Sequence, residues 1–318
     1  MHQGLEACLR AAREIMPANG VRGFQTNGKL LSNQRALNLV ESGLNCIAIS
    51  VDSVDPLLFN TVRPGGELAE VSLAFEAVNH ARKQFPDTPV SLGIQFVLMK
   101  KNMVQLPLLV DWAESHQVDF ILVSHLSAYE KAAEQQAAYM DSSYEAVELF
   151  QKYRQKARAA GIDMGTYEAI RFKMHRDRNE DRLYQLVNEF KQEALEQNFY
   201  VNMFHLLNES RQDYDQLNGI YSEAQEKARR AGIELSLPVI RPKTDRYCPF
   251  IEENARFVSW DGHVSPCYFL WHKYAVMRSG VSKYVNPVHF GNVCEQRAEK
   301  IWQSIEYKGF REKVLRYD

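Results

Sequence analysis

The stretch Cys46-Ile47-Ala48-Ile49-Ser50-Val51 decides the fold class, because it is a short, nearly continuous apolar run followed by polar residues. Such a run is typical of a strand in a parallel sheet that is covered on both faces. Comparable strands are predicted at residues 21–25, 90–99 and 119–123. The first part of the chain therefore contains several buried parallel strands.

Helices alternate with these strands. The helical spacing of apolar residues predicts helices at residues 5–16, 32–42, 71–84 and 105–115. Repeated strand–helix units with short links indicate an α/β fold, either a doubly wound sheet or a (β/α) barrel. Periodicity alone does not choose between the two.

The composition narrows the class of protein further. The 318 residues are 45% hydrophobic and 25% charged, which is enough for one large core or two modest ones in a soluble, globular protein. A net charge of -2 gives no global reason to expect nucleic-acid or membrane partners. No signal peptide or membrane span is visible, so a cytoplasmic location is expected. Five cysteines are too few for a disulfide framework and favour reduced thiols.

Two cysteines bracket a predicted hairpin near the C-terminus. Cys248 precedes Pro249, residues 256–260 form an alternating strand, and Asp261-Gly262 is a strong two-residue turn signal. The return strand then leads to Cys267. Thiols held in this way suit a metal ion or an iron–sulfur cluster.

The pattern of this region resembles the SPASM domain, a cluster-binding extension of many radical S-adenosylmethionine (SAM) enzymes. The matching features are Cys248, Gly262 with Cys267 after four intervening residues, Gly291-Asn292-Val293 and Ile301-Trp302. The resemblance implies a small, incomplete α+β domain at residues 241–318, with Cys248 and Cys267 as ligands of an auxiliary 4Fe-4S cluster. For Cys294, which follows the Gly-Asn-Val turn, a role other than ligand is favoured. The histidines at 263, 272 and 289 lie near the thiols and could ligate iron or zinc, although polar surface positions are the commoner explanation.

Three segments at predicted strand ends resemble successive motifs of the radical SAM barrel: Thr26-Asn27-Gly28, Ser50-Val51-Asp52-Ser53 and Arg63-Pro64-Gly65-Gly66. The resemblance implies that residues 1–240 form a partial TIM-type barrel, from the third strand onward, with a helical insertion at about 165–210.

It also implies a SAM pocket at the carboxyl ends of these strands. Ser50 and Asp52 would contact the ribose or the amino-acid part of SAM, whereas Thr26 and Asn27 would line its methionyl end. Gln95 would point into the pocket, with Ser124 and His125 on the adenosine or substrate side. The alternative is that Ser50 and Asp52 only cap the helix that follows, although Asp55, directly before Pro56, is a competing candidate for that cap.

The middle of the chain is predicted to be helical at residues 129–159 and 178–197. Residues 155–164 and 226–235 echo each other, and each is predicted as a helix that ends at a glycine and continues into a short strand. Cys8 and Cys46 are predicted to be buried, small apolar side chains.

The chain departs from the radical SAM pattern at one point, because it contains no Cys-x3-Cys-x2-Cys loop for the SAM-cleaving cluster. Two functions stay open. The first is a radical SAM/SPASM maturase that acts on a peptide, protein or metallocofactor precursor and is inactive as this chain. The second is a non-catalytic remnant or partner that keeps a SAM-like pocket or a metal site. The open sheet edge predicts an oligomer or a missing N-terminal segment that covers it.

Overall fold

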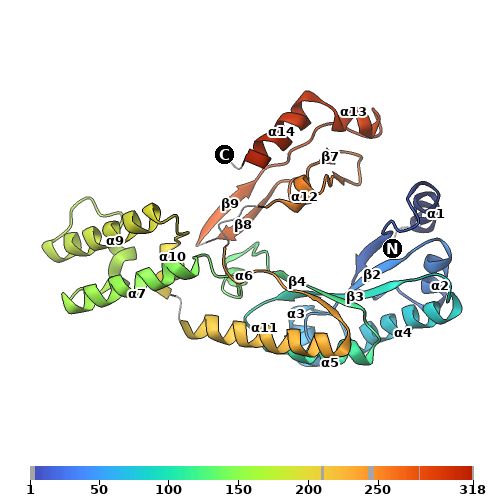
Figure 1. Ribbon diagram of the computed structural model, residues 1–318, viewed down its shortest axis with the longest axis horizontal. Helices are drawn as coiled ribbons and strands as arrows, with labels where there is room; N and C mark the ends of the chain where they lie inside the picture. Colours follow the sequence, from blue (N-terminus) through green and yellow to red (C-terminus); the bar gives the residue numbers. More distant parts are fainter. Residues whose placement is uncertain (1–3, 209–210, 243–246, 279, 317–318) are drawn as a thin grey trace. The chain divides into compact units, whose positions relative to one another are not determined.

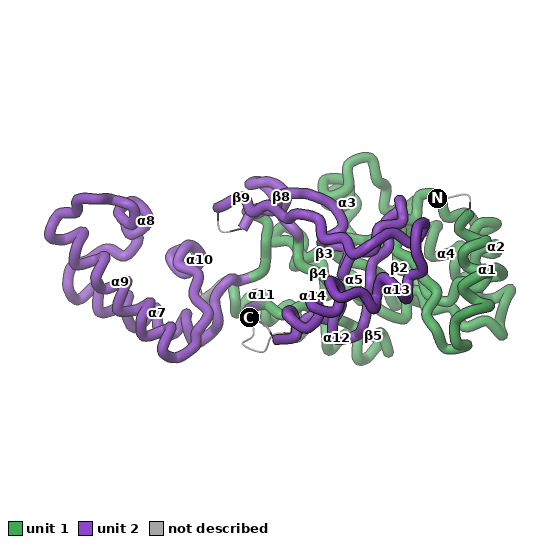
Figure 2. Tube along the Cα trace, turned by 90° about the horizontal axis from the view of Figure 1, so that it is seen from above, with its two compact units in different colours: residues 1–126, 136–139, 210–240 green, residues 127–135, 140–209, 241–318 purple. Residues whose placement is uncertain are grey.

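The computed structural model describes residues 4–208, 211–242, 247–278 and 280–316. The chain divides into two compact units that interleave in the sequence (Figure 2). Unit 1 comprises Met1–Leu126, Gln136–Tyr139 and Ser210–Ile240, and unit 2 comprises Ser127–Gln135, Met140–Glu209 and Arg241–Asp318. The domain boundary expected at residue 240 stays a prediction.

The described part of unit 1 is built on a five-stranded parallel sheet. The strands follow the order of the sequence: β1 Gly23–Thr26, β2 Cys46–Ser50, β3 Ser91–Leu98, β4 Phe120–His125 and β5 Glu234–Ser236. The register places Ile47 beside Leu92 and Ile94 beside Ile121. The predicted α/β class, a partial barrel-like parallel sheet, is confirmed, and β1 lies at one edge of the described sheet.

Helices alternate with these strands, beginning with α1 before β1. They are α1 Leu5–Ile15, α2 Asn33–Glu41, α3 Pro56–Val62, α4 Leu68–Gln84, α5 Leu106–Ser115 and α11 Arg211–Ala231, with a 3-10 turn η1 Met103–Gln105 before α5. Figure 1 shows α4, α5 and α11 along the same face of the sheet. Local sequence fixes their starts: the Ser32 side chain accepts a hydrogen bond from the Arg35 amide, and Asp55 accepts one from Leu58.

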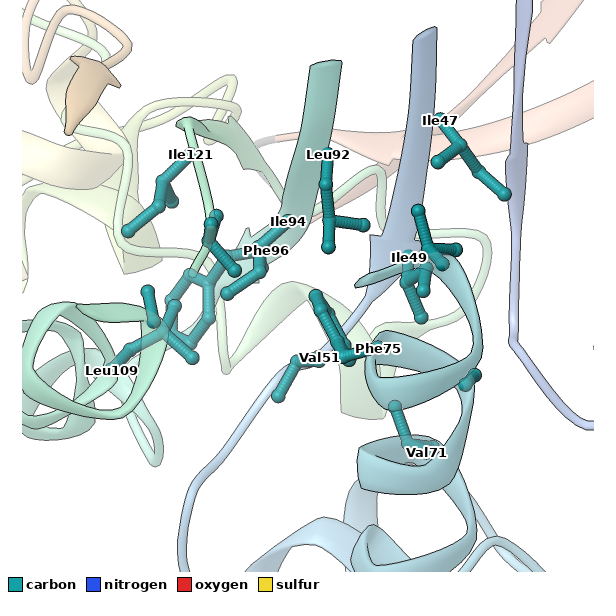
Figure 3. Close-up of a cluster of buried hydrophobic side chains, with 14 of the residues drawn as sticks. Ile47, Ile49, Val51, Val71, Phe75, Leu92, Ile94, Phe96, Leu109 and Ile121 are labelled. Atoms are coloured by element: carbon teal, nitrogen blue, oxygen red, sulfur yellow. The ribbon is translucent and has the colours of Figure 1, made fainter. Parts of the chain in front are cut away.

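The core of unit 1 lies between the sheet and these helices. Ile49, Ile94 and Phe96 are fully buried there and face Phe75 of α4 and Leu109 of α5 (Figure 3). Each such side chain contributes about 1.5–3 kcal/mol when it is removed from water. Because alternate residues of a strand face opposite sides, a slip of one residue would expose this whole set, so burial also fixes the register.

The sequence-based boundaries in unit 1 hold to within three residues, and the second of the echoing segments is confirmed. α11 ends at Ala231, Gly232 adopts a left-handed φ of 69°, and β5 follows. A glycine tolerates this conformation without the steric cost that a side chain would add.

The helical part of unit 2 differs from the prediction in two places. Its elements are α6 Lys131–Glu134, α7 Tyr144–Ala159, η2 Met164–Thr166, α8 Tyr167–Ile170, α9 Arg178–Glu196 and α10 Met203–Asn208. The continuous helix expected at residues 129–159 is wrong, because the backbone between α6 and α7 is not helical and Ser143 caps α7. The strand expected after Gly161 is also wrong, since Asp163 accepts a hydrogen bond from Gly165 and starts a 3-10 turn.

The remainder of unit 2 consists of short helices and antiparallel hairpins. The elements are α12 Pro249–Glu252, β6 Phe257–Val258 paired with β7 Val264–Ser265, β8 Tyr274–Arg278 paired with β9 Val281–Val285, α13 Ala298–Trp302 and α14 Ile305–Arg316. The predicted hairpin around Gly262 is confirmed, whereas the hairpin formed by β8 and β9 was not predicted. Val264, Ile301 and Tyr307 form a small core here.

Candidate cofactor sites

The sheet face opposite the hydrophobic core carries a row of amide and hydroxyl groups. Gln25 Nε2 donates to Ser50 Oγ at 3.1 Å, and Gln95 Nε2 donates to Ser124 Oγ at 3.0 Å. The register pairs Ser50 with Gln95, so these groups cross four adjacent strands. Parallel strands present their carboxyl ends at a common edge, where ligands of open α/β sheets bind. The row can therefore supply hydrogen bonds to a polar ligand.

Thr26 and Asn27 shape the turn that follows β1. Thr26 Oγ1 accepts from the Gly28 amide at 3.2 Å, and Asn27 Oδ1 accepts from the Lys29 amide at 3.3 Å. Gly28 has a φ of 82°, which favours glycine, and the Lys29 ammonium donates to the Gly65 carbonyl. The turn is thus tied to the segment that carries Arg63.

Asp52 is bound inside unit 1. Its Oδ1 accepts from the Val97 amide at 2.7 Å, and its Oδ2 accepts from Nε and Nη2 of Arg63, both at 2.7 Å. The residue is 3% exposed. Both carboxylate oxygens hold the end of β2 to β3 and to Arg63, and Asp55 caps the next helix. A contact of Asp52 with ribose stays a prediction.

Asn102 completes this junction, and the sequence reasoning missed it. The fully buried side chain donates to the carbonyls of Asp52 and Val97, each at 2.9 Å, and accepts from the Met99 amide at 2.7 Å. An asparagine directly after a strand is a turn signal, but the partner at Asp52 lies fifty residues away. Such a long-range bond leaves no local pattern.

Cys248 and Cys267 are brought together in unit 2. Cys248 stands at the start of α12, where its carbonyl accepts from the amides of Ile251 and Glu252, each at 3.0 Å. Burial raises the pKa of the half-buried Cys267 thiol, backbone amides of Phe269 and Leu270 oppose this, and the charge of Cys248 raises it further. The two thiols are therefore within electrostatic reach of each other.

The donor set fits an iron–sulfur cluster in part. A 4Fe-4S cluster is held by four thiolates. Among the described residues, no group of three or more His, Cys, Asp or Glu side chains is placed to hold a metal ion. Cys294 is exposed, and its Sγ lies beside Gly262. Cys248 and Cys267 would thus supply two ligands of a set that the described residues do not complete, and their role as ligands stays a prediction.

The other cysteines lie elsewhere. Cys8 is exposed on α1, so the prediction that it is buried is wrong; the apolar face of this short helix passes through Leu9 instead. Cys46 begins β2 and is half-buried, and burial raises its pKa. Neither belongs to the thiol pair.

The Gly-Asn-Val segment fastens the hairpin of β6 and β7. Val264 donates to the Gly291 carbonyl and Phe290 donates to the Val264 carbonyl, each at 2.9 Å. Asn292 Nδ2 donates to the Asp261 carbonyl at 2.9 Å, while its Oδ1 accepts from the Cys294 amide at 2.8 Å. The segment therefore acts as a third strand beside the turn at Gly262.

The sequence of this region matches the family model of SPASM, an iron-sulfur cluster-binding domain, over residues 248–318. This part of the chain is therefore similar to SPASM domains. The match covers both thiols, the turn at Gly262 and the fastening segment, so it confirms the resemblance of this region to the SPASM domain.

One named relative aligns with most of the chain. The tungsten-containing aldehyde ferredoxin oxidoreductase cofactor-modifying protein of Pyrococcus furiosus is 27% identical over 300 residues, which are 94% of this chain and 64% of the relative. The chain thus spans less than two thirds of that protein's length.

Solved structures give a weaker likeness. SuiB of Streptococcus suis bound to S-adenosylmethionine is 14% identical, with a TM-score of 0.44 over 96% of this chain and 52% of SuiB. The protein anSMEcpe with bound AdoMet is 13% identical, with a TM-score of 0.43 over 97% of this chain and 62% of that one. In the described part of the chain, no helix has the length and apolarity that crossing a membrane requires.

Proposed function

We propose that this chain carries the SAM-binding sheet and the auxiliary-cluster domain of a radical SAM/SPASM maturase, and that it works in the cytoplasm. The observation that carries the proposal is the match of residues 248–318, which include Cys248 and Cys267, to the SPASM family model. If these two side chains only filled an apolar core, neither position would need a cysteine, one before the hairpin and one after it.

The sheet of unit 1 is the proposed SAM site. Ser50 and Gln95 lie side by side in the register and offer hydroxyl and amide groups to the ribose or the amino-acid group of SAM. Thr26 and Asn27, in the turn after β1, lie at the same edge. Asp52 acts by holding the strand ends in place, since Arg63 and the Val97 amide already bind its oxygens.

Cys248 and Cys267 are the proposed ligands of the auxiliary cluster. When bound, such a cluster accepts an electron or binds substrate. The protein's part is to hold the two sulfurs, to lose their protons when metal binds, and to limit water through the partial burial of Cys267. Tyr268 and Tyr274 lie close enough for the Cys267 charge to raise their pKa, after burial as the main cause.

The proposed substrate is a peptide, protein or metallocofactor precursor. The relative from Pyrococcus furiosus is named a cofactor-modifying protein, and SuiB has been solved with its precursor peptide SuiA. These names support a maturation role without choosing among the three substrate classes.

The chain itself is proposed not to cleave SAM. Its sequence has no Cys-x3-Cys-x2-Cys loop, and without those thiolates no cluster with an open iron site delivers an electron to the sulfonium. The same observation favours the second candidate, a non-catalytic partner that retains a SAM-like pocket or a metal site.

Anaerobic reconstitution with iron and sulfide tests the proposal. Cys267→Ala is expected to lower the bound iron, whereas the matched variant Cys46→Ala is expected to leave it unchanged. Equal iron in both variants would remove the basis for the cluster site. After addition of dithionite and SAM, the amount of 5′-deoxyadenosine should not exceed that of a protein-free control. Robust turnover would show that the proposed inability of this chain to cleave SAM is wrong.

A further inference from the structure

Two histidine rings lie close together in unit 2, one from the hairpin of β6 and β7 and one from the segment that fastens it. His263 directly precedes β7, and His289 lies in the segment that runs into Gly291. Their ring centroids are 4.9 Å apart, and the ring planes are tilted by 43°. Neither ring belongs to the SPASM pattern of cysteines and glycines.

A carboxylate fixes the orientation of the first ring. His263 Nδ1 lies 3.0 Å from Asp261 Oδ2. The Asp261 carboxylate also accepts a hydrogen bond from Ser259 Oγ, and an ionised carboxylate has no hydrogen to donate to the ring. Nδ1 therefore carries the hydrogen, and the neutral ring keeps its lone pair at Nε2.

A hydroxyl holds the second ring in the same way. His289 Nδ1 lies 3.1 Å from Oγ of Ser265, which is fully buried. The hydroxyl oxygen can accept from Nδ1–H, which again leaves the lone pair at Nε2. Histidines that bind metals typically donate their other ring nitrogen to such a partner.

The spacing of the rings matches that of two ligands on one ion. With metal–nitrogen bonds of about 2.1 Å, a metal lies about 3.2 Å from each ring centroid, which puts the centroids about 4.5 Å apart at a right angle and about 5.2 Å apart at a tetrahedral angle. The observed 4.9 Å lies between these values.

The backbone holds the two histidines in this arrangement. His263 and Asn292 form an antiparallel bridge, and Val264 exchanges hydrogen bonds with Gly291 and Phe290, each at 2.9 Å. His263 is therefore held by a bridge beside β7, and His289 lies next to Phe290 in a segment that backbone hydrogen bonds fasten to Val264.

We propose that His263 and His289 form a binding site for a divalent transition-metal ion, separate from Cys248 and Cys267. Imidazole nitrogens suit zinc, cobalt, nickel and copper. Since no third protein ligand is in place among the residues described, water or a donor group of a bound substrate completes the coordination, as in metal sites that keep an open position. The site stands independently of the SAM and cluster assignments.

Cobalt titration of the metal-free full chain, without iron and under anaerobic conditions, tests this site. The unmodified protein is expected to show ligand-field absorption, and His263→Ala and His289→Ala should each weaken that binding at least tenfold. His272→Ala is the matched control, because this ring lies in the same domain but stacks on Tyr274. It should titrate like the unmodified protein.

The thiol pair is distinguished by its spectrum. Cobalt on Cys248 and Cys267 gives a thiolate charge-transfer band, which should vanish in Cys267→Ala while the histidine-dependent absorption persists. If an alanine variant melts early, Asp261→Asn serves instead, with an expected loss of about 10–100-fold in affinity. Unchanged binding in both histidine variants, or loss of all cobalt binding in Cys267→Ala, would overturn the proposal.

Discussion

Arg63→Ala is expected to destabilise unit 1 by about 3 kcal/mol, because it leaves a buried carboxylate without its cation. Asp52 is 3% exposed, and its Oδ2 accepts two hydrogen bonds from Arg63, each at 2.7 Å. Removing one partner of such a pair costs about 3–5 kcal/mol. The Arg63 side chain is 29% exposed, so water already reaches part of the guanidinium and the lower end of that range applies.

Urea denaturation combined with hydrogen exchange provides the assay. The Val97 amide donates to Asp52, so protection of β3 reports on this junction separately from unit 2. Arg13→Ala is the control, since this exposed arginine makes a long 3.4 Å hydrogen bond to the Glu41 carbonyl and should change stability by less than about 0.5 kcal/mol.

The double variant Asp52→Ala with Arg63→Ala separates lost charge pairing from lost packing. It should lose less stability than the sum of the two single variants, because no unpaired charge then stays buried. A loss below about 1 kcal/mol in Arg63→Ala would refute the reasoning. Asp52 would then be available to a ligand, as the sequence first predicted.

Three further predictions follow from the same structure. Burial opposes ionisation of Asp141, yet the hydrogen bond from His205 and the charge of Arg278 lower its pKa. The stability this adds is present above the ordinary value near pH 4 and is lost as pH falls through the lower folded value, so unit 2 should melt earlier in acid. Gly262→Ala should cost more than about 1 kcal/mol, since a Cβ there would lie 2.5 Å from a side-chain oxygen at a φ of 86°. Asn102→Ala should lower the free energy of unfolding by at least about 2 kcal/mol in urea denaturation, because three buried backbone groups lose their hydrogen-bond partner.

Each of these has a matched control. Asp141→Asn should flatten the acid dependence of melting, and an unchanged profile would contradict the assignment. Gly219→Ala in α11 has open space around its Cβ and should stabilise the helix by about 0.5–1 kcal/mol. Asn27→Ala, at an exposed turn, should cost far less than Asn102→Ala; similar losses would show that burial is not the cause.

The sheet was predictable because its signal is local. The short apolar runs that become β2, β3 and β4 stand out in the sequence, although the face away from the core carries polar side chains such as Ser50 and Gln95. Ser32 and Asp55 mark helix starts through hydrogen bonds from amides three residues away. The SPASM hairpin was equally predictable, since Asp261-Gly262 specifies its turn.

The break between α6 and α7 was not predictable, because distant residues cause it. The Ser143 amide donates to the Tyr200 carbonyl at 3.0 Å, and the Asn202 amide donates to Ser142 Oγ at 3.0 Å. These bonds compete with helix formation only after the chain has folded back. The internal role of Asp52 was hidden for the same reason, since its partners at Arg63 and Val97 depend on strand pairing.

The helical part of unit 2 lies between β4 and β5 in the sequence, and this affects the order in which the protein folds during synthesis. β5 and α11 emerge from the ribosome after the helical segment. The edge of β4 therefore stays unpaired, and the surface of α5 stays exposed to water, until β5 and α11 have been synthesised. The helical segment has its own core, and the bond between Ser143 and Tyr200 ties its two ends together. When this segment folds first, the long loop between β4 and β5 becomes a short one, and the entropy lost on closing the sheet decreases.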